Sequence, residues 1–192
     1  KRDLDAAKQY LAECKYDPSE FTLEISWIGE VPIEERFALL MQANFSELGI
    51  RSEIRKVPWA LFTEQVTKPE TTPHISQIFA NAVTGDPDTL LYTMYHSSVS
   101  GTWQAAEYLN DAEVDAALEE GRTVADQDAR AAAYKRLNDR LMAIAPTIYG
   151  YDRQSVFAAS NRVRVPALTD PDKAFALDGM GFTFRLMEMT GE

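Results

Sequence analysis

The sequence contains very little cysteine, little histidine and no excess of basic residues. Cys14 is the single cysteine among 192 residues, which excludes an internal disulfide bond and the paired-cysteine motifs of zinc and redox sites. Lys and Arg number 19 and Asp and Glu 30, giving a net charge of −11. This balance argues against nucleic acid as a partner, because such binding depends on Lys and Arg neutralising phosphates. No run approaches the roughly 18 consecutive apolar residues of a membrane span.

The common catalytic and cofactor motifs are missing as well. The sequence has no GxxxxGK phosphate loop, no GxGxxG after a strand, no HExxH and no GxSxG. The two histidines, His74 and His96, lie at a predicted strand start and a predicted helix end, and neither has a partner at ligand-like spacing. We therefore assign both a structural role and expect no catalytic residue, no metal site and no cofactor.

The pattern of apolar residues predicts an α/β fold. Apolar residues alternate over 21–27, recur at helical spacing over 33–48, and are followed by a second strand-like segment over 50–57. Strand, helix and strand in this order form a βαβ unit, whose strands are expected to be parallel. Further strands are predicted at 74–80, 147–151 and 182–187, and further helices at 4–14, 58–66, 88–95, 111–121 and 126–145.

Several local features of these helices are specific predictions. The helical spacing over 4–14 places Cys14 on the buried side, as a small core residue. Gly49 is expected to end the second helix in the left-handed conformation, Asp126 to cap the long helix, and Pro146 to stop it. The predicted apolar stripe of the second helix consists of Ile33, Phe37, Leu40, Asn44 and Leu48.

A small set of residues is chemically suggestive. Asp86 and Asp88 flank a proline, and two carboxylates at this spacing suit either a hard cation, a shared proton or the cap of the next helix; we favour the cap. Trp103 lies in a predicted loop, where it either stacks on a ligand or packs locally. Trp59 stands at a helix start and is assigned to the core or to a cleft.

An ordered series of short motifs runs along most of the chain. The motifs are Thr22-Leu23-Glu24-Ile25, Ala43-Asn44 to Gly49-Ile50, Val57-Pro58-Trp59, Gly85-Asp86-Pro87-Asp88, Tyr108-Leu109-Asn110-Asp111, Asp126 with Arg130 and Tyr134, and Ala145-Pro146. This series resembles the C-terminal half of the family 5 extracellular solute-binding proteins, the receptors of peptide-type ABC importers. The resemblance implies an α/β, periplasmic-binding-protein-like lobe of type II, with a mixed sheet flanked by helices.

The resemblance also implies a function and a domain organisation. Residues 1–160 would form the second, C-terminal lobe of a two-lobe protein, and residues 161–192 would return toward the missing first, N-terminal lobe. The whole would capture a small solute, such as a peptide, a sugar or a conjugate, by hinge closure and deliver it to an ABC transporter permease. It would be periplasmic, or extracellular and membrane-associated through the transporter, and it would not be an enzyme.

One departure from the family pattern bears on the solute. Peptide-binding members carry a Gly-Trp pair and then an Asp that anchors the α-amino group of the peptide, and here Ala80 and Val83 occupy the Trp and Asp positions. Because a buried ammonium without a carboxylate is costly, we predict that the ligand is not a free-amino peptide. The predicted ligand-binding residues are Phe79, Asn81, Val83, Thr84 and Trp103. The alternatives are a protein-interaction module and a small acidic hydrolase that uses Asp86 and Asp88.

Overall fold

The chain folds into two units, each with its own core. The structure is a computed structural model that describes residues 2–82, 84–152, 156, 158–170, 172, 177–178, 181–182 and 187–190. Unit 1 consists of Lys1–Phe79 and Ser97–Asn110, and unit 2 consists of Ala80–His96 and Asp111–Glu192. The chain therefore passes between the units at three points.

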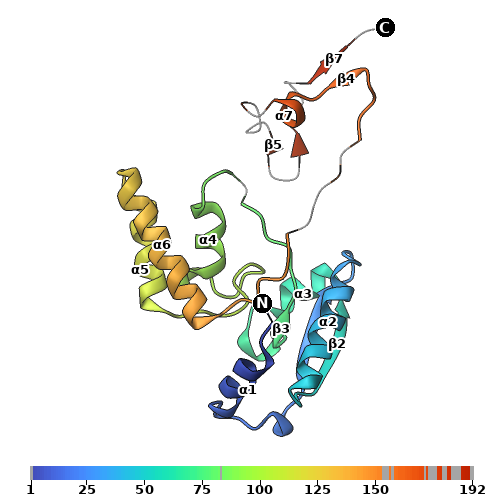
Figure 1. The fold of residues 1–192 in the computed structure, drawn as a ribbon, viewed down its shortest axis with the longest axis vertical. Helices are drawn as coiled ribbons and strands as arrows, with labels where there is room; N and C mark the ends of the chain where they lie inside the picture. Colours follow the sequence, from blue (N-terminus) through green and yellow to red (C-terminus); the bar gives the residue numbers. More distant parts are fainter. Residues whose placement is uncertain are drawn as a thin grey trace. The chain divides into compact units, whose positions relative to one another are not determined.

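Unit 1 is built around a parallel sheet with the strand order β2-β1-β3 (Figure 1). Its register pairs Ile25 of the central strand with Ile54 on one side and Ile75 on the other. The elements of unit 1 are α1 (Leu4–Ala12), η1 (Pro18–Glu20), β1 (Leu23–Ile28), α2 (Glu34–Glu47), β2 (Ser52–Val57), α3 (Trp59–Gln65), η2 (Pro69–Thr71), β3 (Ile75–Ser76) and η3 (Ser97–Val99).

Both faces of this sheet are covered, as expected for a parallel sheet. The residues of the α2 face are Ile25, Trp27, Ala38 and Met41, with Phe37, Phe45, Ile54 and Ile75 packed against them. The residues of the α3 face are Ile28, Val57, Phe62 and Val66, with Val31, Ile78, Trp103 and Ala106 packed against them. The successive strand residues Trp27 and Ile28 thus enter opposite cores.

Two predictions about the helices of unit 1 are wrong in detail. Helix α1 ends at Ala12, so Cys14 lies beyond it and is exposed. In α2 the buried residues are Glu34, Ala38 and Met41, one position further along than the predicted stripe, and Leu40 is 55% exposed. The helix meets the sheet through the row of residues next to its most apolar row, and a sequence pattern does not distinguish two adjacent rows. Gly49 does adopt the predicted left-handed conformation, with φ +75°.

Two of the predicted strands also differ from the structure. Strand β3 covers only Ile75–Ser76 of the predicted 74–80, because the chain stops pairing with β1 shortly after it. Residues 147–151 form no strand in the described part of the chain, where hydroxyl contacts from another helix hold them instead. The predicted strand 182–187 lies largely outside the described residues, with its first residue in β6.

Unit 2 is mainly helical, and α5 and α6 run side by side in Figure 1. Asp111 and Asp126 cap these two helices, as predicted for Asp126, and each side chain accepts a backbone N–H of the first turn. Ala145, with φ +46°, ends α6 before Pro146. The elements of unit 2 are α4 (Asp88–Tyr95), α5 (Ala112–Thr123), α6 (Gln127–Ile144), β4 (Val163–Arg164), α7 (Pro166–Thr169), β5 (Leu177–Asp178), β6 (Gly181–Phe182) and β7 (Glu188–Met189).

The helix pair α5–α6 packs through small and aliphatic side chains. Gly121 leaves room for the Tyr134 ring, since a Cβ at this position would lie 2.9 Å from that ring. The short strands β4 and β7 pair antiparallel, as do β5 and β6. The buried residues of the two helices are Val114, Ala117, Leu118, Gly121, Ala133, Leu137 and Leu141. The predicted α/β class, with a sheet flanked by helices, is confirmed, but the three described strands of the unit 1 sheet are all parallel and do not form the expected mixed sheet.

Candidate functional site

The carboxyl edge of the unit 1 sheet is the natural starting point for a site. The strands end at Ile28, Val57 and Ser76, and because they are parallel these ends meet at one edge. In open α/β sheets, ligands bind outside this edge. The predicted site residue Phe79 belongs to the segment that leaves β3 from this edge, and its side chain is half-buried.

Two tryptophans pair near this edge. Trp59 directly follows Pro58 after β2, and its ring meets the Trp103 ring edge to face, with centroids 5.3 Å apart at 69°. Trp103 packs onto the Ile28 and Val57 side of the sheet, whereas Trp59 is 38% exposed. Trp103 therefore has a local packing role, and the pair leaves part of its aromatic surface open to solvent.

The loop that carries Trp103 is held firmly to unit 1. Gly101 adopts φ +83° and donates its N–H to Ala105 O at 3.1 Å. Tyr108 donates its hydroxyl to Val66 O at 2.8 Å, and a Cβ at Gly101 would lie 3.3 Å from the same hydroxyl. The first hydrogen bond closes the loop on itself at its buried Ala105, and the second ties the loop to the end of α3.

Two carboxyl groups of unit 1 are shielded from solvent, that of Glu34 fully and that of Glu107 in part, and neither was predicted from the sequence. Glu34 is 1% exposed and accepts the Ile28 N–H at 2.8 Å, and burial raises its pKa to about 7. Burial likewise raises the pKa of Glu107 to about 7, against the opposing effect of its own backbone N–H. Its Oε1 is shielded from solvent and has no hydrogen-bond partner within the described residues. The signal available in the sequence was the helical spacing of Glu34 from Ala38 and Met41. The adjacent row of α2 is more apolar, so the sequence pattern favoured that row instead.

The predicted site residues in unit 2 lie in the segment that leads to α4. Asn81 and Thr84 are exposed, and Val83 lies outside the described residues. The Thr84 hydroxyl oxygen accepts the Asp86 N–H at 3.2 Å, so this residue shapes the turn before the helix. Asn81, the other predicted polar residue, makes no such local contact within the described part of the chain, and its side chain is exposed.

The two aspartates of the Gly-Asp-Pro-Asp turn are neutralised by arginines. Asp86 accepts the Asp88 N–H at 2.9 Å and pairs with Arg130 at 2.7 Å. Hydrogen bonding to Arg130 holds the pKa of Asp86 below its usual value. Asp88 pairs with Arg122 at 3.2 Å. These contacts tie the turn to α5 and α6. The favoured prediction, a cap of the next helix, is wrong, because Pro87 holds the N-cap position of α4 and no side chain caps it.

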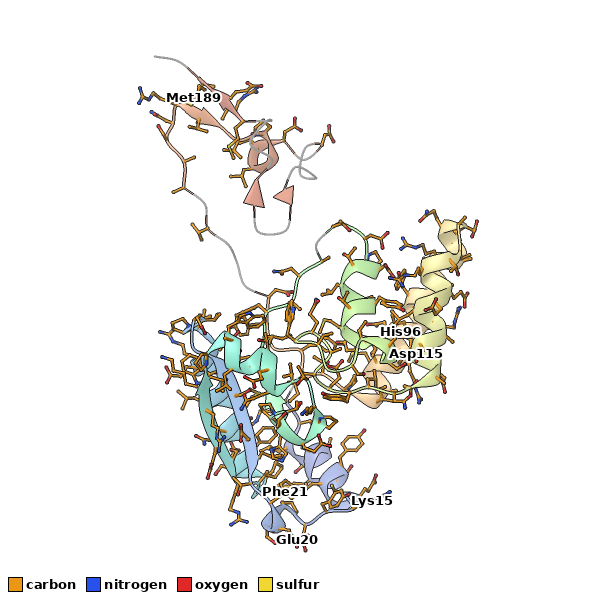
Figure 2. The ribbon with its side chains drawn as sticks, turned by 180° about the vertical axis from the view of Figure 1, so that it is seen from behind. Lys15, Glu20, Phe21, His96, Asp115 and Met189 are labelled. Atoms are coloured by element: carbon orange, nitrogen blue, oxygen red, sulfur yellow. The ribbon has the colours of Figure 1, made fainter. Side chains whose placement is uncertain are left out.

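Both histidines make structural contacts. The His74 Nδ1 accepts the Glu24 N–H at 3.1 Å, which fixes the entry to the sheet. His96 stacks on Tyr92 with ring centroids 4.3 Å apart. The His96 Nε2 lies 3.9 Å from the Asp115 Oδ1, and both residues are labelled in Figure 2. No group of His, Cys, Asp and Glu side chains within the described ranges is arranged to hold a metal ion.

Comparison with known proteins identifies the family. Residues 1–102 match the model of the bacterial extracellular solute-binding proteins, family 5, middle region. The chain belongs to this family. Because family 5 consists of solute-binding proteins rather than enzymes, the acidic hydrolase alternative is set aside.

Individual relatives agree with this assignment. Heme-binding protein A of Haemophilus influenzae is 31% identical over 140 residues, which are 70% of this chain and 24% of that protein. DppA from Helicobacter pylori, solved in complex with the peptide STSA, is 25% identical with a TM-score of 0.64. The match covers 75% of this chain and 28% of the DppA chain. NikZ from Campylobacter jejuni, solved in complex with Ni(L-His), has a TM-score of 0.66 at 21% identity. The match covers 76% of this chain and 31% of the NikZ chain, and at this identity it shows only that the two chains share a fold.

The family 5 chain is short compared with these relatives. It spans about a quarter of the length of the curated proteins that it matches, and a little more of each of the two solved structures. In the described residues, none of the helices combines the length and the apolar character needed to cross a bilayer.

Proposed function

We propose that this chain is the C-terminal lobe of a receptor that captures a small solute by hinge closure and delivers it to an ABC transporter permease. The observation that carries the proposal is the match of residues 1–102 to the family 5 model. The parallel sheet, with an aromatic pair near its carboxyl edge, supports it. Residues 1–160 form the lobe and residues 161–192 return toward a first lobe supplied by the rest of the protein. The receptor acts in the periplasm or at the outer cell surface.

The solute is not a peptide with a free amino terminus. The position that peptide-binding members give to the anchoring aspartate is Val83, and the nearest aspartates in sequence, Asp86 and Asp88, are already paired with arginines. A peptide ammonium placed here would be buried without a carboxylate, which is costly. A sugar, a conjugate or another neutral or anionic solute fits these residues better.

The ligand contacts are assigned by residue chemistry. Phe79 and Trp103 provide apolar and aromatic surface, Val83 adds to it, and Asn81 and Thr84 provide hydrogen bonds. Binding then stabilises the closed form in proportion to the difference in affinity between the closed and open forms.

Native mass spectrometry of the full-length protein from its own host tests the function directly. A retained small molecule is the expected result, and releasing it identifies its chemical class. Calorimetric titration with a dipeptide should show no micromolar binding, and tight dipeptide binding would refute the assignment based on Val83. A folded full-length protein that binds no member of a solute library but retains a protein partner would instead favour an interaction module.

A substitution tests the site assignment separately. Asn81→Ala should weaken binding of the identified solute by about fivefold, the effect of losing one hydrogen bond. Asn138→Ala is the matched control, because Asn138 is also exposed but lies on α6. Equal affinities of the two variants would remove Asn81 from the site.

A further inference from the structure

The hydrogen-bond ladder between β1 and β3 ends beside a buried carboxyl group. The Gln77 N–H donates to Ser26 O at 3.0 Å, which extends the ladder one residue beyond β3. In a parallel pair the next donor along β1, the Ile28 N–H, would bond the Gln77 carbonyl. It donates to the Glu34 carboxyl instead, at 2.8 Å. The Glu34 carboxyl therefore takes the place of the next β3 carbonyl, next to Gln77.

The side chains of Gln77 and Glu34 share one face of the sheet. Gln77, two residues after Ile75, stands opposite Trp27 in the register of the two strands. Ile75 and Trp27 lie in the core on the α2 face, whereas Ile78 packs in the core on the α3 face. Because strand residues alternate between faces, the Gln77 side chain takes the α2 face, and Glu34 belongs to the first turn of α2.

The two side chains have complementary hydrogen-bonding needs. Gln77 is 8% exposed, and among the residues that the structure describes its Oε1 has no hydrogen-bond partner. A buried acceptor of this kind is costly unless it receives a donor. Glu34 is 1% exposed and burial raises its pKa to about 7, so its carboxyl holds a proton in neutral to acidic solution. A protonated carboxyl carries one O–H donor.

The charged groups around Glu34 are occupied elsewhere or exposed. Those on α2, on the loop before it and on β2 are Glu35, Arg36, Glu30 and Lys56. Glu30 accepts the Trp59 N–H at 3.1 Å, Lys56 Nζ lies 5.3 Å from the centroid of the Trp27 ring, and the other two side chains are exposed. The pKa of Glu34 is set by burial, which raises it, and by the hydrogen bond from the Ile28 N–H, which lowers it.

We propose that the protonated Glu34 carboxyl donates a hydrogen bond to Gln77 Oε1 and thereby holds the chain that leaves β3 against the carboxyl edge of the sheet. We call this pair the Glu34–Gln77 latch. Ionisation removes the donor and sets a carboxylate against the amide oxygen, so the latch opens as the pH rises. Its effect on the solute rests on the proposed function, in which Phe79, two residues beyond Gln77, contacts the solute. Glu34 and Gln77 are positioning residues and make no contact with the solute.

Amide hydrogen exchange of the full-length protein, measured by mass spectrometry over residues 75–79, tests the latch. Local opening of this segment exposes its N–H groups to exchange. After division by the intrinsic rate, exchange should become faster between about pH 6 and about pH 8, as Glu34 ionises. Gln77→Met removes the acceptor at similar side-chain length. It should accelerate exchange about fivefold at about pH 6, the effect of one hydrogen bond, and hardly at all at about pH 8.

Glu34→Gln tests the same latch from the other side. Glutamine supplies an oxygen to the Ile28 N–H and an N–H to Gln77 Oε1 at every pH, so exchange should stay slow over the whole range. In this background, Gln77→Met should accelerate exchange about fivefold at both pH values. Glu35→Gln and Gln9→Met are the matched controls, because both residues are exposed, and they should behave like the original protein.

Two results would overturn the latch. One is equal acceleration by Gln77→Met at both pH values in the original background, which would indicate lost packing rather than a lost hydrogen bond. The other is exchange that still rises with pH in Glu34→Gln, a result that stands even if Gln77→Met does not fold. None of these measurements uses a solute, so a failure to capture solute would count against the proposed function alone.

Discussion

Replacing Glu34 with glutamine should remove about half of the pH dependence of the stability of unit 1 between about pH 5 and about pH 8. Glu34 is 1% exposed, and burial raises its pKa from 4.5 to about 7. The folded state therefore binds this proton more tightly than the unfolded state does. The stabilisation is complete below about pH 4.5 and is lost as the pH rises through about 7, where the folded protein must ionise a buried carboxyl.

The magnitude follows from the difference between the two pKa values. One pKa unit corresponds to about 1.4 kcal/mol, so ionised Glu34 lowers the free energy of unfolding by about 3 kcal/mol at most. Glutamine keeps an oxygen to accept the Ile28 N–H, which Glu34 accepts at 2.8 Å, and it does not ionise. The variant should therefore be the more stable protein at about pH 8, by up to about 3 kcal/mol.

The three tryptophans allow this unit to be followed by itself. Trp27, Trp59 and Trp103 all lie in unit 1, so their fluorescence during urea unfolding reports on the unit that contains Glu34. Midpoints measured at a series of pH values give the free energy of unfolding as a function of pH, provided the slope with urea stays constant.

Two further variants control the measurement. Glu107 has a comparable pKa and lies in the same unit, so Glu107→Gln should remove the remaining half of the dependence and the double variant should be nearly flat. Glu64→Gln, at an exposed position of α3, should leave the dependence unchanged. A Glu34→Gln curve parallel to that of the original protein would refute the burial argument.

Three shorter predictions concern the packing of α5 and α6 and the exposure of Cys14. Gly121→Ala should destabilise unit 2 by about 1–3 kcal/mol, because the new Cβ would lie 2.9 Å from the Tyr134 ring. Adding Tyr134→Leu should restore part of the lost stability. Urea unfolding followed by far-UV circular dichroism measures both effects. In the same assay, Leu137→Ala should lower the free energy of unfolding by about 2–5 kcal/mol, because Leu137 is fully buried. Met142→Ala should lower it by less than about 1 kcal/mol, because Met142 is 61% exposed. Comparable losses in the two variants would contradict the packing of α6. Cys14 should react with a thiol reagent in the folded protein as fast as in urea, and protection on folding would mean that it is buried after all.

Local patterns determined much of the architecture. The alternation of β1 and the amphipathic helix after it were enough to predict a βαβ unit, because a parallel pair needs such a crossover and few other arrangements bury both faces. The caps were equally predictable. Asp126 and Gly49 act through the backbone of their own helix ends, so nothing distant decides them.

Features that depend on distant contacts were not available from the sequence. Which row of α2 meets the sheet is decided by the strands that it packs on, so Glu34 is buried and Leu40 exposed. Residues 147–151 have a strand-like composition, yet the Tyr95 hydroxyl fixes them in another conformation. For the site, the sequence identified the residue types and the unusual Val83, whereas the pairing of Trp59 with Trp103 and the burial of Glu107 arise only when the loop closes onto the sheet. Short-range patterns therefore determined the elements, and long-range packing decided which side chains they bury and which they present.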